Sequence, residues 1–389
     1  MYIIHVGFSG FPKGMASVQR TLLTFKGLKL TGLTPLIINK ISHHQYSNNN
    51  TVRLFDGILY VNTSYLNSKP TSFIKRNFNK VSGYLGELKL LYKKRKKIGT
   101  AILYSTYFLE YPYYFVLSKI FGFKLIIQNV EMFSAIPGRR SLFTKINDQL
   151  MDRYLGSFCD GIIAISNYLV DHLKKSGSGT PVIKIPANSD FSQIDFIPTL
   201  QSEPYLMYCG TIHYEEVIEF IILLFVKLRE NNKYSGRLLL IISGNDGQNW
   251  DKLRSFIKTL SFQQDIIIKS NISHNELLST YKGADILMIP LRETVQDIAR
   301  FPHKIGEYTA AKRPILSTNL GEMKSYFIDG VSAILADNYS LKAYYEKLSV
   351  MLASRQLLDE IGLKGYAIGQ NNFDYKEQGR ILKEFIDNL

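Results

Sequence analysis

Short apolar runs alternate with longer, more polar segments along the N-terminal half of the chain. Each run has four or five residues, many of them β-branched, and is nearly continuous in apolar side chains. This pattern is typical of strands that are covered on both faces of a parallel sheet. The predicted strands are 2–6, 35–38, 57–61, 101–104, 124–127 and 161–165. The intervening segments include predicted helices at 17–29, 73–97 and 141–156, so we expect βαβ units.

The segment 186–204 interrupts this alternation with three prolines and many polar residues, and it predicts a linker. The alternation then resumes. Further strands are predicted at 205–209, 238–243, 265–269, 286–289, 314–317 and 332–336. Open α/β sheets bind their ligands at the carboxyl ends of the strands. Two doubly wound domains joined by a linker therefore predict a ligand site in an interdomain cleft.

Composition narrows the class of protein further. The chain has 389 residues, of which 46% are hydrophobic and 21% charged, so a large core is expected and global disorder is excluded. The most apolar stretch, 217–228, contains Glu219 and Lys227, and no membrane span is expected there. The chain starts with a predicted strand rather than a signal peptide, and Cys159 and Cys209 are its only cysteines. We therefore expect a cytoplasmic protein without a disulfide framework.

The net charge of +14 is spread unevenly along the chain. Residues 1–185 carry 25 Lys and Arg against eight Asp and Glu, whereas residues 186–389 have a net charge of −3. Such asymmetry predicts an anionic partner for the N-terminal half. Nucleic acid, a membrane surface and a phosphorylated substrate all meet this requirement.

Two segments carry candidate chemistry. The glycine-rich turn 7–16 (GFSGFPKGMA) follows the first predicted strand and precedes a helix, so its backbone can approach an anion closely. It fits neither the dinucleotide-binding motif nor the P-loop, and a turn that only packs the helix on the strand is an equally simple interpretation.

The second segment is 300–314 (RFPHKIGEYTAAKRP), in which Pro302 indicates the start of a helix. Lys304 and Glu307 are three residues apart on one helical face, and Arg300 lies just before them. Two cations near a helix N-terminus can hold a diphosphate, and a carboxylate can accept both hydroxyl hydrogen bonds of a ribose. An ordinary surface ion pair between Lys304 and Glu307 is the alternative.

Several motifs resemble the donor site of glycosyltransferase family 4. They are the segment 302–315, the turn 242–247 (ISGNDG), the segment 276–286 (ELLSTYKGADI) and the strand end 208–211. The resemblance implies an α/β protein of the GT-B fold, with two facing Rossmann-like doubly wound domains. It implies an N-terminal acceptor domain over 1–185, to which a C-terminal helix at about 370–389 returns, and a donor domain over 186–369. The activity it implies is that of a retaining transferase that uses a nucleotide-sugar.

The resemblance also implies the residues of the site. The donor-binding positions are Gly14, Gly210, Thr211, Gly244, Ile272, Phe301, Lys304 and Glu307. The family often has two glutamates eight positions apart, and here Ala299 stands in place of the first. Thr211 and Glu215 or Glu216 stand where an arginine and a lysine are usual. We therefore expect Arg300 and Lys304 to stabilise the leaving diphosphate.

Glu131 is the polar residue nearest to the position of the family's histidine after the fifth strand, and it is the third catalytic candidate. Its carboxylate can orient or deprotonate an acceptor hydroxyl, or it can cap the helix that follows. No Asp-x-Asp and no H-x-x-x-H occurs in the sequence. We therefore predict no metal site, no cofactor and a metal-independent reaction, with a UDP-sugar favoured over a GDP-sugar as donor.

The predicted helix at 73–97 ends in the run Lys93-Lys94-Arg95-Lys96-Lys97 and carries an apolar stripe. A basic amphipathic helix can lie on an anionic membrane. A solvated face on a helix that packs on the core is the alternative, and nucleic-acid binding is a third but lacks any accompanying motif.

The sequence thus predicts a hexosyl-type transferase that acts on a glycan acceptor, one that is lipid-linked and belongs to bacterial-type surface polysaccharide assembly. It is expected in the cytoplasm, with a peripheral position on the inner face of the cell membrane as an option. The alternative is a non-catalytic GT-B subunit of a polysaccharide-assembly complex, favoured by Ala299, Thr211 and the acidic pair at 215–216.

Overall fold

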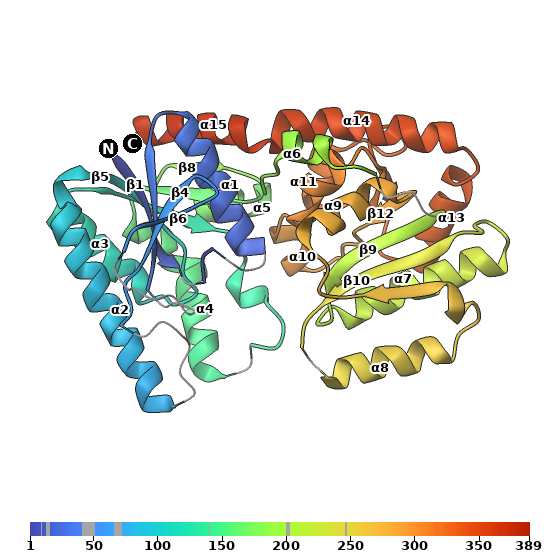
Figure 1. Cartoon of the computed structure of the whole chain (residues 1–389), viewed down its shortest axis with the longest axis horizontal. Coiled ribbons are helices and arrows are strands. Elements are labelled where there is room, and N and C mark those ends of the chain that lie inside the picture. Colours follow the sequence, from blue (N-terminus) through green and yellow to red (C-terminus); the bar gives the residue numbers. More distant parts are fainter. Residues whose placement is uncertain are drawn as a thin grey trace. The chain divides into compact units, whose positions relative to one another are not determined.

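The computed structural model describes residues 1–8, 10–12, 16–40, 51–65, 72–139, 141–199, 203–245 and 247–389. The chain divides into two compact units (Figure 1). The N-terminal unit comprises Met1–Asn188, Ala299–His303 and Tyr375–Leu389. The C-terminal unit comprises Ser189–Ile298 and Lys304–Asp374.

The N-terminal unit is built on an eight-stranded sheet with the order β3-β4-β2-β1-β5-β6-β7-β8. Its strands are β1 (Tyr2–Phe8), β2 (Thr34–Asn39), β3 (Arg53–Phe55), β4 (Ile58–Asn62), β5 (Ile98–Leu103), β6 (Lys124–Asn129), β7 (Gly161–Ala164) and β8 (Val182–Lys184). All pairs are parallel except β3 with β4. The six predicted strands are present. The edge strands β3 and β8 were not predicted, because each has only three residues and neither is fully buried.

Helices cover this sheet and connect its strands (Figure 1). They are α1 (Ala16–Leu30), α2 (Phe73–Lys94), α3 (Glu110–Phe121), α4 (Leu142–Tyr154), α5 (Asn167–Lys175) and, from the end of the chain, α15 (Tyr375–Asp387). Helix α15 packs on α1, and its Leu382 belongs to the same buried core as Phe25 and Leu28. The two helices approach closely at Gly27, where a Cβ atom would lie 2.3 Å from the carbonyl oxygen of Tyr375.

The C-terminal unit contains a six-stranded sheet with the order β11-β10-β9-β12-β13-β14, and all of its pairs are parallel. Its strands are β9 (Tyr205–Thr211), β10 (Arg237–Ser243), β11 (Ile266–Lys269), β12 (Ile286–Met288), β13 (Ile315–Thr318) and β14 (Ile334–Ala336). Each corresponds to a predicted strand. The prediction of two Rossmann-like α/β domains is confirmed.

The helices of the C-terminal unit are α6 (Phe191–Phe196), α7 (Glu215–Glu230), α8 (Gly247–Lys258), α9 (His274–Gly283), α10 (Val295–Ala299), α11 (Lys304–Ala310), α12 (Gly321–Tyr326), α13 (Leu341–Met351) and α14 (Arg355–Phe373). Helix α7 contains the most apolar stretch of the sequence, and nine of its residues are buried in the core of this unit. Within the described part of the chain, no helix combines the length and apolar character needed to cross a bilayer.

The segment predicted as a linker is more structured than its composition suggests. Asp190 caps α6 by accepting a hydrogen bond from the Gln193 N–H at 2.9 Å. The ammonium group of Lys282 donates to the carbonyl of Ile194 at 3.2 Å, and Lys312 forms an ion pair with Asp195 at 2.7 Å. A helix of six residues is too short to give a periodic signal, which explains why the sequence predicted only a linker here.

Candidate functional site

The loops that follow β9, β10 and β11 meet at one edge of the C-terminal sheet, because these strands are parallel and adjacent. Gly210 and Thr211 end β9, Gly244 follows β10, and Ile272 lies between β11 and α9. Gly244 has a φ of +124°, and a Cβ atom there would lie 2.6 Å from Ile212. Only glycine fits this position. The structure thus brings four of the predicted donor-binding residues to the edge where ligands bind in such sheets.

Lys304 and Glu307 lie on α11, which begins at Lys304. Burial is the largest effect on Glu307 and raises its pKa, whereas the charges of His274 and Lys304 lower it. His274 is the first residue of α9. The structure therefore surrounds one carboxylate with two basic side chains from two helices. His274 was missed by the sequence analysis, because nothing in the local pattern distinguishes it from a surface histidine.

Helix α11 is fixed beneath these side chains by aromatic residues. The hydroxyl oxygen of Tyr308 accepts a hydrogen bond from the Cys209 N–H at 3.3 Å, which ties α11 to β9. The ring of Tyr281 lies 4.9 Å from that of Tyr308 in an edge-to-face contact, and both side chains are fully buried. Since α11 is anchored to the strand that ends at Gly210, the position of Glu307 relative to this strand is set by the core.

The acidic residues that depart from the family pattern have a partner in the structure. Glu216, in the first turn of α7, lies 3.3 Å from Arg292, and Arg292 in turn pairs with Asp297 at 2.9 Å. Asp297 is fully buried. Glu216 and Asp297 are therefore both engaged with Arg292. Asp297 lies two residues before Ala299, which stands in place of the expected glutamate.

Three of the remaining candidate residues belong to the N-terminal unit. Glu131 follows β6, and its charge acts on Arg20, whose guanidinium group lies 5.1 Å from the ring centre of Tyr104. Arg300 and Phe301 belong to the segment Ala299–His303, in which the Ala299 carbonyl accepts a hydrogen bond from the Ser166 hydroxyl. Arg20 was not predicted, because only the fold brings it next to Glu131. Gly14 lies outside the described residues.

A polar cavity of about 520 Å³ opens at the carboxyl edge of the N-terminal sheet. Lys40 pairs in it with Glu110, and the Tyr84 hydroxyl contacts both of them. Lys40 also lies 4.2 Å from the ring centre of Tyr84. The lining also includes two further aromatic residues, Tyr104 and Tyr107, and a second lysine, Lys80. The sequence analysis missed this cluster, whose members come from distant segments.

Below Lys40 and Glu110 lies a second carboxylate, Glu87 of α2, which is completely buried. It accepts a hydrogen bond from the Tyr114 hydroxyl at 2.7 Å. Burial raises the pKa of Glu87 to about 7, and Glu110 acts in the same direction, while Lys40 and Tyr114 lower it. The cavity thus lies over a buried cluster of two carboxylates and one lysine.

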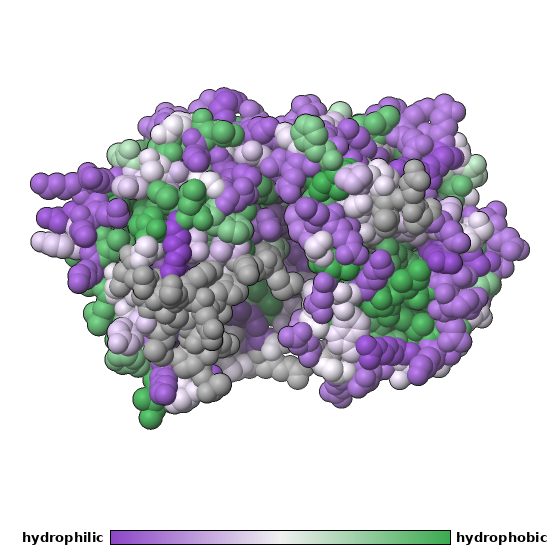
Figure 2. Space-filling view, in the orientation of Figure 1, coloured by the Kyte–Doolittle hydropathy of each residue, from purple (hydrophilic) through white to green (hydrophobic). Residues whose placement is uncertain are grey.

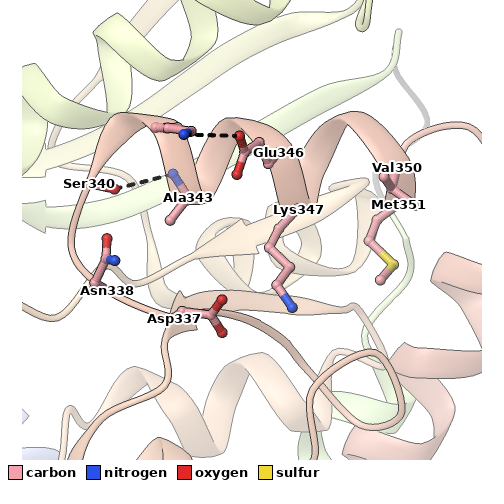
Figure 3. A pocket seen from close by; sticks show the side chains of 9 residues that line it. Asp337, Asn338, Ser340, Ala343, Glu346, Lys347, Val350 and Met351 are labelled. Carbon is pink, nitrogen blue, oxygen red and sulfur yellow. Dashed lines mark hydrogen bonds and ion pairs between the residues drawn. The ribbon is translucent and has the colours of Figure 1, made fainter.

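A further cavity of about 510 Å³ lies along α13 in the C-terminal unit (Figure 3). It is lined by Asp337, Asn338 and residues of α13, among them Lys347, which pairs with Asp329. None of the predicted site residues lines it. Among the described residues, no group of three or more His, Cys, Asp and Glu side chains is arranged to hold a metal ion.

Comparison with known proteins identifies the class of fold. Residues 190–367 match the family model described as glycosyl transferases group 1. A comparison with curated protein sequences returned no match. Among solved structures, sucrose-phosphate synthase from Thermosynechococcus elongatus has a TM-score of 0.75 at 13% identity, covering 100% of this chain and 99% of the other.

Two other solved structures are similar over the whole chain. A glycosyltransferase from Rickettsia africae has a TM-score of 0.71 at 16% identity, with 100% and 98% of the two chains covered. The HepE protein of Anabaena, in complex with UDP, has a TM-score of 0.69 at 12% identity, with both chains fully covered. These structural similarities confirm the predicted GT-B fold. The segment that matches the family model, residues 190–367, includes Lys304 and Glu307.

Proposed function

We propose that this protein is a retaining glycosyltransferase that moves a sugar, of the hexosyl type, from a nucleotide-sugar to a hydroxyl of a glycan acceptor. The observation that carries the proposal is the group of Lys304, Glu307 and His274 at the carboxyl edge of the C-terminal sheet. It lies in the segment that matches glycosyl transferases group 1. HepE, of the same fold, is named as a complex with UDP and with UDP-glucose, which favours a UDP-sugar here.

Each donor-site residue has a role in this proposal. Glu307 accepts hydrogen bonds from the two ribose hydroxyls, since its carboxylate is held among basic side chains. Lys304 and Arg300 hold the diphosphate, and Gly210, Thr211 and Gly244 let the donor approach the strand ends. Ile272 and Phe301 supply apolar contact, and Gly14 is assigned to the donor by the resemblance alone.

In the reaction one bond to the anomeric carbon of the sugar is broken and another is formed. The bond between the sugar anomeric carbon and the diphosphate oxygen breaks, and the diphosphate leaves with the electron pair. The acceptor oxygen then bonds to the same face of the anomeric carbon and loses its proton to the solvent, either directly or through a base. Cations at the diphosphate stabilise the charge that develops there. Glu131 is the candidate that orients or deprotonates the acceptor hydroxyl.

We place the acceptor on the N-terminal unit. The cavity over Lys40 and Glu110 offers tyrosine rings on which a sugar can stack and charged groups that hydrogen-bond to hydroxyls. A lipid-linked acceptor in surface polysaccharide assembly, and a cytoplasmic protein at the inner face of the membrane, agree with the charge of +17 on residues 1–185. The reaction needs no metal ion in this proposal.

A non-catalytic GT-B subunit is the second candidate. It is favoured by Ala299 and by the pair Glu215 and Glu216, which makes the first turn of α7 acidic. Such a turn is unfavourable for a diphosphate at this helix end.

A thermal-shift panel with UDP, GDP, ADP, CMP and dTDP distinguishes the two candidates. We expect UDP to stabilise the protein without added metal, by about 2.7 kcal/mol at 100 times its dissociation constant. Glu307→Gln removes a charge-assisted hydrogen-bond acceptor and should weaken UDP binding by about 1–3 kcal/mol. Glu360→Gln, at an exposed residue of α14, is the control and should leave binding unchanged. Absence of any nucleotide effect, with or without divalent metal, would favour the non-catalytic candidate.

A further inference from the structure

Helix α2 turns its apolar side outwards. Ile74, Phe78, Val81 and Leu85 follow one another at steps of four, three and four residues, which places them on one face. Each is between 58% and 78% exposed. The helix packs on its own unit through a different set, Asn79, Gly83, Glu87 and Leu91. The stripe is therefore not the face through which α2 packs on its unit.

The beginning of α4 adds to this apolar surface. Leu142, Phe143 and Ile146 are between 46% and 86% exposed. In Figure 1 the N-terminal ends of α2 and α4 point to the same side of the N-terminal unit. Figure 2 shows hydrophobic atoms in green at the tip where α2 begins, whereas purple hydrophilic side chains cover most of the visible surface. We call these seven residues of α2 and α4 the apolar rim.

Cations surround the apolar rim. On α2, the exposed side chains of Lys75, Arg76, Lys80, Lys89 and Lys93 lie beside it. The one carboxylate of α2, Glu87, is completely buried on the other side. The surface around α2 is thus both apolar and cationic, with no exposed acidic residue on the helix.

We propose that the apolar rim and its cations form a docking surface for an anionic lipid bilayer. Apolar side chains enter the boundary between head groups and acyl chains, while the Lys and Arg side chains meet anionic head groups. An anionic bilayer therefore accounts for both the apolar side chains and the cations of this surface.

Charge and side-chain type favour a bilayer over the other occupants. A second copy that packed the same face of α2 against itself would place lysines opposite lysines, whereas paired helices need complementary flanking charges. Nucleic acid satisfies the cations and could stack on Phe78 and Phe143, but the five aliphatic members of the rim give its bases no stacking surface, whereas a bilayer accommodates all seven.

The docking surface continues towards the cavity of the N-terminal unit. Lys80 of α2 lines the cavity that contains Lys40 and Glu110. A neighbouring cavity of about 630 Å³ shares Thr106 and Tyr107 with it and reaches Phe143 of the apolar rim. A lipid-linked acceptor can therefore keep its chain in the bilayer while its polar head lies in the cavity. This last role rests on the proposed function, whereas bilayer binding does not.

Vesicle sedimentation of the full chain tests the proposal. The protein should bind vesicles that contain phosphatidylglycerol and not vesicles of phosphatidylcholine alone, and added salt should weaken the binding. The triple variant Ile74→Ser, Phe78→Ser and Phe143→Ser should lower it by about ten-fold or more. The matched control changes Ile328, Val350 and Leu363 to Ser, since these are exposed apolar residues of the C-terminal unit, and it should bind as the wild type does.

Several results would overturn the proposal. They are failure of the wild type to bind phosphatidylglycerol vesicles, equal binding by the rim and control variants, or release of the vesicle-bound protein by duplex RNA. A wild-type dimer that the rim variant converts to a monomer would assign the rim to a second copy instead. The UDP thermal shift is measured on every variant. A retained shift with lost vesicle binding shows an intact fold, and it separates failure of bilayer docking from failure of the proposed function.

Discussion

Glu87 gives the clearest expectation at the scale of a single residue. Its pKa is raised from the usual 4.5 to about 7 by burial, so the native state keeps a proton that the unfolded state loses above pH 4.5. Its contribution to the free energy of unfolding therefore falls between about pH 4.5 and 7. We expect Glu87→Gln, which is neutral throughout, to gain stability relative to the wild type by on the order of 1–3 kcal/mol across this range.

Urea denaturation at pH 5 and pH 8 measures this difference. His5 changes stability in the opposite direction, because burial and the charge of Arg20 lower its pKa to about 3, so only the difference between variants is informative. Asp171→Asn, which removes an exposed carboxylate of the same unit, is the control. Equal pH dependence in Glu87→Gln and the wild type would show that Glu87 is ionised in the native state.

At this scale the sequence predicted the residues of local motifs. Lys304 and Glu307 are three residues apart in one helix, and Gly244 directly follows β10, so short-range pattern was sufficient to place them on these elements. His274 lies near Glu307 only because the chain folds, and the same holds for Arg20 and Glu131. Their roles depend on which distant segments become neighbours, and a single sequence carries no sign of this.

The contact of α1 with α15 gives a prediction at the scale of elements. Alanine favours a helix over glycine by about 1 kcal/mol, yet a Cβ atom at Gly27 would lie 2.3 Å from the Tyr375 carbonyl oxygen and 3.0 Å from the Cα atom of Gly379. The clash involves backbone that cannot turn away. Gly27→Ala should therefore lower the free energy of unfolding by about 1–3 kcal/mol, as measured by chemical denaturation.

Gly247→Ala provides the comparison for this substitution. Gly247 is the first residue of α8 and has no atom within 4 Å of the added Cβ, so its replacement should be neutral or slightly stabilising. A stabilised Gly27→Ala variant would mean that the two helices are farther apart than described.

Elements with a continuous apolar core-facing run were predicted well from the sequence. All twelve predicted strands have counterparts in the two sheets. The short edge strands β3 and β8 and the six-residue helix α6 have too few buried residues to produce a pattern. For α2, periodicity predicted the helix but not which face points inwards, because Gly83 and Glu87 on the inner face are not apolar.

At the scale of the whole molecule, each unit has a hydrophobic core of its own. We therefore expect two calorimetric transitions rather than one. UDP should raise the transition temperature of the C-terminal unit more than that of the N-terminal unit, because Lys304 and Glu307 belong to the C-terminal unit. Gly27→Ala should lower only the transition temperature of the N-terminal unit. A single transition that both changes shift together would contradict this independence.

The two-domain architecture followed from the repeated alternation and the proline-rich interruption, which are properties of the whole sequence. The assignment of Ala299–His303 to the N-terminal unit did not follow from it. Ala299 ends α10 and the other four residues lie between α10 and α11, and no local pattern sets this segment apart from its neighbours.

The return of α15 to the N-terminal unit affects how the protein is made. Residues 375–389 supply Leu382 to a core that is otherwise built from the first half of the chain. These residues are translated after the whole C-terminal unit, so the unit whose translation begins first is completed only after the other one has been made. Until then α1 exposes the surface that α15 covers, and a nascent chain at this stage is a substrate for chaperones. A variant that lacks residues 375–389 would remain in that state permanently.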